Sequence, residues 1–265
     1  MRLDKNEKVL KPVRANAGVS AAYQKELDTL VSEMQASLVY WLRAEYRANP
    51  PEALALDASP ASELNAAMKR LAARWQRRFN KDAPALAKKF AQSASRHTDI
   101  ALQGRLREAG LTVRFSPTRT QNDIFAATVN QNVALIKSIA AQHLTDVQGI
   151  VQRSVQAGRQ MSVMSKELQD KFGVTKRRAA LICTTQNNLA TASMTKVRYV
   201  ELGIEEAIWY HSSAGKTHRA THEAMDRKRY IVSEGMYDSA EGRKVQPGEL
   251  INCRCYGAAV MKGLS

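Results

Sequence analysis

Aromatic residues, cysteines and long apolar runs are all scarce in this chain of 265 residues. Aromatic side chains make up only 6% of it. The first eight residues are charged and lead into no apolar segment of the kind that a signal peptide needs, and no stretch approaches the roughly 18 apolar residues of a membrane span. These absences predict a protein made in a cytoplasm-like, reducing compartment, with no membrane partner.

The three cysteines, Cys183, Cys253 and Cys255, are too few and odd in number for a secreted disulfide framework. Alanine, leucine, lysine, arginine and glutamine are frequent, whereas the β-branched and aromatic residues typical of all-β proteins are not. The composition therefore predicts a mainly α fold, in which long amphipathic helices are followed by a small, short-stranded C-terminal α+β domain.

The net charge of +15 is unevenly distributed. Residues 201–265 carry nine basic and nine acidic side chains, so the whole excess lies in residues 1–200. A basic helical region is expected beside nucleic acid or an acidic protein surface, but simple solvation of a helix surface explains it as well. Without aromatic platforms, any contact with DNA is expected to be backbone-directed, non-specific and sensitive to salt.

The first 19 residues are expected to form an irregular arm, because Pro12, Asn16 and Gly18 break any helix there. Apolar residues then recur at spacings of three and four, which predicts a basic helical region over residues 20–157. Ser20 is expected to cap its first helix, which ends at Asn49-Pro50-Pro51.

The second and third helices of this region are expected to meet at Asp82, which is placed to cap the third, and Gly110 is expected to end it. A further helix is predicted from Asn122 to about Ala157, with His143 as a core residue without a functional role. The second helix has a basic face that is a candidate surface for a partner or DNA: Lys69, Arg70, Arg74, Arg77 and Arg78.

Residues 158–203 are predicted to form a helical hairpin. Gly158 and Gly173 bound a short helix, and Thr175 is expected to cap a long helix that Gly203 ends. Residues 204–265 then change character, with strand-like segments around Trp209 and at the C-terminal end, and we predict a small α+β domain there. Together the two parts form a predicted domain over residues 158–265.

Two histidines and two cysteines in the C-terminal domain form a candidate metal site. His218 and His222 share a face if their turn is helical, and the thiols of Cys253 and Cys255 point to the same side of an extended segment. Two imidazoles and two thiolates suit a tetrahedral structural zinc ion. A single Cys-x-Cys pair is not diagnostic of a metal site, however. If no metal is bound there, His218 is simply an exposed side chain.

Several short motifs follow one another between about Gly158 and Met261. They are Arg178-Ala179-Ala180-Leu181-Ile182, Gly203-Ile204, Trp209, Arg219, His222, Pro247-Gly248 and the terminal Asn252-Cys253-Arg254-Cys255. In these motifs the segment resembles the Mu F-type phage head-morphogenesis family, also called the minor head protein family. The resemblance covers about the last 40% of the chain and departs from the family pattern at Arg227, where members often have glycine.

This resemblance implies a low-copy minor head protein of a tailed bacteriophage rather than an enzyme. It implies a component of the virion, assembled in the host cytoplasm and located inside the head at the portal vertex. The expected partners are the portal protein, the major capsid protein and packaged double-stranded DNA, with roles in head morphogenesis, DNA packaging or DNA ejection. The zinc ion is not implied by the family and rests on the residues alone.

Two alternatives remain open at this point. One is a metal-dependent hydrolase or nuclease at the His/Cys site, with Glu223 as general base. Asp226 stands where the second histidine of a His-Glu-x-x-His motif would be, and four protein ligands would leave no position for water. The other is a non-specific DNA-binding protein, although no helix-turn-helix or zinc-finger spacing supports it.

Overall fold

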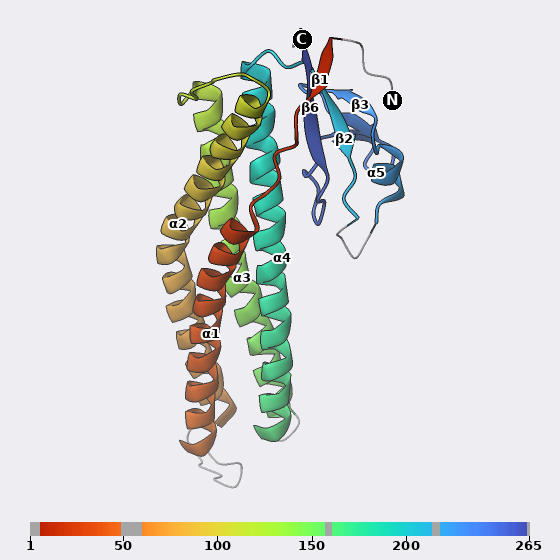
Figure 1. Ribbon diagram of the computed structural model, residues 1–265. Coiled ribbons are helices and arrows are strands. Elements are labelled where there is room, and N and C mark those ends of the chain that lie inside the picture. Colours follow the sequence, from red (N-terminus) through yellow and green to blue (C-terminus); the bar gives the residue numbers. More distant parts are fainter. Residues whose placement is uncertain (1–5, 49–59, 157–160, 214–217, 264–265) are drawn as a thin grey trace. The chain divides into compact units, whose positions relative to one another are not determined.

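The computed structural model describes residues 6–48, 60–156, 161–213 and 218–263 (Figure 1). Long helices precede a small antiparallel β region, so the predicted fold class is confirmed. The helices are α1 (Ala17–Ala48), α2 (Pro60–Glu108), α3 (Arg119–Gln156), α4 (Met161–Glu201) and α5 (Ala220–Ala224). The strands are β1 (Glu7–Val9), β2 (Glu206–Tyr210), β3 (Arg229–Ile231), β4 (Met236–Asp238), β5 (Arg243–Val245) and β6 (Tyr256–Lys262).

The chain divides into two compact units, and each gathers segments that are distant in sequence. Unit 1 comprises Met1–Ala21, Lys88–Val129 and Cys183–Ser265, and unit 2 comprises Ala22–Ala87 and Asn130–Ile182. The predicted boundaries after residues 19 and 157 therefore do not coincide with the limits of the compact units. The reason is that the long helices run through both units, which a division of the chain into consecutive segments cannot represent.

Unit 2 is a bundle of four helical segments that lie side by side (Figure 1). Each segment contributes one apolar stripe with spacings of three and four to the common core, as expected for amphipathic helices. Fully or almost fully buried members of these stripes include Leu27, Met34, Leu38, Phe79, Ile136, Ile139, Val147, Met164 and Leu168.

The core of unit 2 contains a polar network centred on His143. Its Nδ1 atom lies 2.8 Å from Thr175 Oγ1 and its Nε2 atom lies 3.0 Å from Gln35 Oε1. Burial lowers the pKa of His143 to about 4, so the ring is neutral at pH 7. His143 is thus a core residue with both ring nitrogens partnered, as its place on an apolar stripe predicts.

Two predicted helix breaks are wrong. Residues 60–108 form one helix that contains Pro84, and Asp82 pairs with Arg78 at 2.5 Å instead of capping a new helix. Residues 161–201 also form one helix, so the hairpin predicted to break at Gly173 is not present in the described residues. In both cases the buried stripe continues across the expected break, and packing outweighs the local preference of proline or glycine.

Helix α3 would be long and apolar enough to cross a membrane, with a mean hydropathy of 1.2 over an 18-residue window. The sequence prediction that no stretch approaches a membrane span therefore does not hold by this measure. One helix of this kind is only weak evidence for a membrane span, because the core helix of a helical bundle passes the same test of length and hydropathy. Its buried residues Ile136, Ile139 and Val147 recur at helical spacing along one stripe, as in a bundle.

Unit 1 contains a four-stranded sheet in the order β1-β6-β2-β3, with antiparallel pairing throughout, and a separate β4–β5 hairpin. The N-terminal segment supplies β1, which pairs with β6 so that Lys8 faces Met261. The prediction of an irregular arm over residues 1–19 is therefore wrong at β1 and at the start of α1, whereas residues 10–16 have no regular secondary structure. Helix α1 also begins before Ser20, because the Asn16 side chain accepts hydrogen bonds from the Gly18 and Val19 amides at 2.8 and 3.3 Å.

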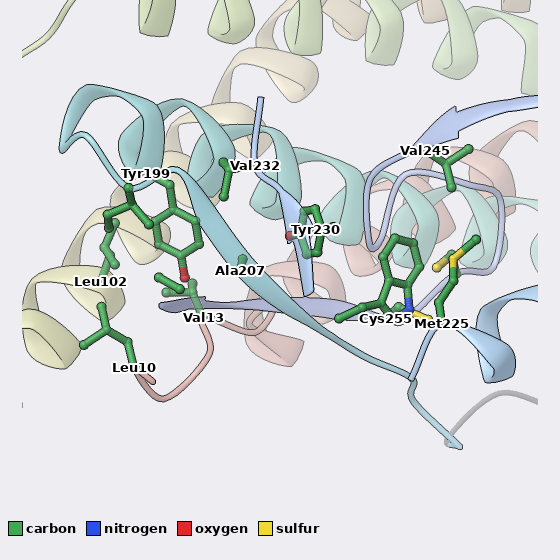
Figure 2. Close-up of a cluster of buried hydrophobic side chains, with 14 of the residues drawn as sticks. Leu10, Val13, Leu102, Tyr199, Ala207, Met225, Tyr230, Val232, Val245 and Cys255 are labelled. Carbon is green, nitrogen blue, oxygen red and sulfur yellow. The ribbon is translucent and has the colours of Figure 1, made fainter. Parts of the chain in front are cut away.

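The core of unit 1 lies between the sheet and helical segments of the same unit (Figure 2). Leu10 and Val13 come from the N-terminal segment, and Leu102 and Tyr199 come from α2 and α4. Gly203, with φ of +70°, ends α4 as predicted and directs the chain into β2. The remaining members of the cluster are Leu106, Ile204, Ala207, Trp209, Met225, Tyr230, Val232, Val245, Leu250, Cys253, Cys255 and Ala259.

We predict that the neutral state of His143 makes unit 2 sensitive to acid. The unfolded state takes up a proton near pH 6.5 and the folded state only near pH 4, so stability is fully present above pH 6.5 and is lost as the pH falls between these values. The loss is on the order of 3 kcal/mol. Urea unfolding at several pH values measures this loss, followed through Trp41 and Trp75, which both lie in unit 2, in a Trp209→Phe background.

His143→Gln is the matched variant, because it removes the titrating group while keeping hydrogen-bonding capacity. Its unfolding free energy should vary less between pH 6.5 and pH 4 than that of the chain with His143. If both proteins lost the same amount of unfolding free energy between pH 6.5 and pH 4, the prediction would be contradicted.

Candidate metal centre

The short helix α5 places His222 in the core of unit 1, where the side chain is 2% exposed. His218 does not share its face. The backbone at Arg219 is extended (φ −99°, ψ 116°) and α5 begins only at Ala220, so the four-residue spacing does not span a helical turn. His218 is exposed instead, with Nδ1 3.5 Å from Glu223 Oε1.

Both cysteines of the Cys-x-Cys pair converge on His222. Its Nδ1 atom lies 3.4 Å from Cys253 Sγ and 3.6 Å from Cys255 Sγ, and these three atoms all lie within 4.8 Å of one another. The two cysteines are buried, in the segment that leads into β6. The structure thus brings together three of the four predicted ligands, His222, Cys253 and Cys255, which we call the His–Cys cluster.

Asp238, at the end of β4, completes this arrangement and was not identified from the sequence. Its carboxylate is fully buried and lies 3.0 Å from His222 Nε2. It also accepts hydrogen bonds from the Ala240 amide at 2.9 Å and from the Thr221 side chain. No spacing motif connects Asp238 with His222, so only the fold reveals this contact.

Backbone amides surround the two sulfur atoms. The N–H groups of Gly248 and Cys255 donate to Cys253 Sγ, and that of Ser212 donates to Cys255 Sγ. Gly248 has φ of +87°, and a Cβ atom there would lie 3.2 Å from both Ala192 Cβ and the Cys255 carbonyl oxygen. The Pro-Gly turn therefore favours glycine both for its conformation and because a Cβ atom there would be crowded by Ala192 and the Cys255 carbonyl.

The electrostatics of the His–Cys cluster favour one thiolate. The hydrogen bond from Cys255, together with His222 and the amides, lowers the pKa of Cys253, and the same pairing raises the pKa of Cys255. Burial opposes protonation of His222, but Cys253 and Asp238 outweigh it and raise the pKa of the imidazole. Burial likewise opposes ionisation of Asp238, but its hydrogen bonds and His222 lower the pKa of that carboxyl.

The remaining motif residues hold the chain around the cluster. Arg219 donates to the Ile251 carbonyl at 3.1 Å, and Asn252 adopts a left-handed conformation with φ of 62° directly before Cys253. Arg254 is exposed and, with Cys255, lines a cavity of about 200 Å³. Arg227 has φ of 58°, which explains why glycine suits the position after Asp226.

Chemically, the cluster offers one imidazole nitrogen and two sulfur ligands in a buried setting. This donor set suits zinc and other ions that bind sulfur. Glu223, the general base of the hydrolase hypothesis, is half exposed and pairs with His218 outside the cluster. Asp226 accepts a hydrogen bond from the His211 amide at 2.8 Å, so its role is to hold the segment after β2.

Comparison with known proteins locates a family segment in this chain. Residues 145–258 match the family model described as Phage Mu protein F like protein, and this confirms the resemblance found in the sequence. An uncharacterized protein of Haemophilus influenzae is 29% identical over 149 residues, which are 56% of this chain and 32% of that protein. The matched part of the chain thus spans about a third of its relative's length. No solved structure matches the chain.

We predict that Gly248→Ala destabilises unit 1 by about 1–2 kcal/mol, because an L side chain is strained at this φ and meets Ala192. Gly104→Ala, on α2 in the same unit, is the matched control. Its Cβ would meet no atom within 4 Å, and the helix should gain about 0.5–1 kcal/mol.

Urea unfolding followed through Trp209, in a Trp41→Phe/Trp75→Phe background, measures both effects because the two replaced tryptophans lie in unit 2. Equal stability of the Gly248→Ala variant and its parent would show that the turn imposes no constraint on this position.

Proposed function

Because residues 145–258 are a Mu F-like segment, we propose that this chain is a minor head protein of a tailed bacteriophage. In this proposal it is a low-copy component of the virion, bound to the portal protein or the inner capsid and required for head morphogenesis. The family match carries the proposal, since it extends from α3 to β6 and contains the whole His–Cys cluster together with Asp238.

A structural role fits the construction of the cluster better than hydrolysis does. His222, Cys253 and Cys255 are at most 8% exposed, and Asp238 is fully buried. The hydrolase hypothesis needs Glu223 beside the metal, but its carboxylate contacts His218 on the surface. We therefore propose that the site serves the fold and assembly of the protein and not the turnover of a substrate.

A contact with packaged DNA is part of the proposal and rests on the basic face of α2. Lys69, Arg70, Arg74, Arg77 and Arg78 are all exposed. Arg70 lies 3.8 Å from Glu45, and Arg78 pairs with Asp82, so part of their charge is neutralised within the protein. Lys69, Arg74 and Arg77 are then the side chains best placed to contact phosphates.

We expect quantitative mass spectrometry of particles purified from cells that carry the native gene cluster to detect this protein at a few copies per particle. Its amount should scale with that of the portal protein across preparations. Absence from both mature particles and proheads would refute the proposed function.

We expect the DNA affinity of the full chain to fall with salt, and the triple variant Lys69→Gln/Arg74→Gln/Arg77→Gln to flatten this dependence. The slope of log K against log salt should decrease by roughly 3, one for each phosphate that the variant no longer neutralises. Fluorescence anisotropy with a labelled duplex at several salt concentrations measures it.

Lys25→Gln/Lys166→Gln/Arg177→Gln is the matched control, because it removes the same charge from exposed positions on α1 and α4. If both triple variants change the slope equally, DNA binding depends on the net charge of the chain and not on the basic face.

A further inference from the structure

The geometry of the His–Cys cluster is that of an ion site. For zinc with metal–sulfur bonds near 2.3 Å and metal–nitrogen bonds near 2.0–2.1 Å, tetrahedral angles place the nitrogen and sulfur atoms roughly 3.5 Å apart. The distances from His222 Nδ1 to Cys253 Sγ and Cys255 Sγ are 3.4 and 3.6 Å. Both nitrogen–sulfur distances therefore already have the length that a tetrahedral zinc ion requires.

The orientation of His222 is also that of a ligand. Metal-binding histidines commonly donate their second ring N–H to a carboxylate, which selects the tautomer and aims the free nitrogen at the metal. Asp238 occupies this place, 3.0 Å from Nε2, and leaves Nδ1 directed at the two sulfurs. The carboxylate is held in turn by the Ala240 amide and Thr221, so its position is well defined.

Backbone amides stabilise negative charge on sulfur in the His–Cys cluster. Amide N–H groups from Gly248, Cys255 and Ser212 point at them, and such hydrogen bonds stabilise thiolates, the form in which cysteine binds metals. Burying an imidazole, a carboxylate and two thiols in an apolar core is costly unless their polar groups are satisfied. Apolar side chains in the same place would carry no such cost. A bound cation would offset the cost of burying these polar groups.

We propose that the chain binds one zinc ion through His222 Nδ1, Cys253 Sγ and Cys255 Sγ, with Asp238 as a positioning residue. All three protein ligands lie in the part of the chain that the structure describes, and the cavity lined by Cys255 and Ser212 lies next to the site. The ion joins α5 to the segment before β6 across 31 residues of sequence. This proposal goes beyond the head-protein role and stands or fails independently of it.

The first test is metal binding by the full chain, stripped with a chelator and kept reduced. We expect one equivalent of Zn²⁺ to bind, measured by elemental analysis after gel filtration. Co²⁺ in its place should give sulfur-to-cobalt charge-transfer bands in the near ultraviolet and the intense visible bands of a tetrahedral ion. Substoichiometric zinc, or a cobalt spectrum without thiolate bands, would overturn the proposal.

Ligand variants locate the site. Cys253→Ser and Cys255→Ser should each abolish stoichiometric binding, whereas Cys183→Ala, at the third buried cysteine, should retain it. His218→Ala should also retain one zinc ion and an unchanged cobalt spectrum, because His218 lies outside the cluster. Loss of the ion in the His218→Ala variant would overturn the three-ligand assignment.

The role of Asp238 can be tested without removing any of the three metal ligands. Asp238→Asn keeps the side-chain shape and a hydrogen-bond acceptor but removes the charge opposite His222. We expect zinc affinity to fall roughly 10–100-fold while the thiolate-to-cobalt bands remain. An unchanged affinity in a competition titration against a chelator of known strength would remove Asp238 from the site.

Discussion

An imidazole that is buried in an apolar core needs a partner for each ring nitrogen, and in unit 1 this requirement holds distant segments together. His222 comes from α5, its Nε2 partner Asp238 from β4, and the sulfurs that face Nδ1 from the segment before β6. The short helix and the two-stranded hairpin are too small to be stable alone. Their attachment to the four-stranded sheet depends on these buried polar contacts as well as on apolar packing.

The same requirement shapes unit 2. His143 is fully buried between Thr175 and Gln35, which lie on two other helices. Thr175 has the residue type of a helix cap, but its hydroxyl oxygen lies 2.8 Å from His143 Nδ1 and 3.1 Å from the Lys171 carbonyl oxygen within α4. A side chain that satisfies a buried histidine in mid-helix is not available to begin a new helix, and α4 is continuous for that reason.

Sequence spacing was a good guide to the site only where the local backbone was known. Cys253 and Cys255 are two apart in a segment without regular secondary structure that directly precedes β6, and their thiols do converge. His218 and His222 are four apart, but the inference needed a helical turn, and α5 starts one residue after Arg219. Sequence spacing could not have identified Asp238, because its contact with His222 arises from the packing of the β4–β5 hairpin against α5.

The sequence by itself determined the mainly α fold, the apolar stripes, the exposed basic face and the resemblance to the Mu F-like family, because each depends on residue type and periodicity along the chain. Tertiary structure alone decided that α2 continues through Pro84 and that the N-terminal segment supplies β1. It also decided that His222 contacts Asp238 and not His218. These outcomes depend on contacts between distant segments, whose packing and buried hydrogen bonds outweigh the local preferences that a sequence displays.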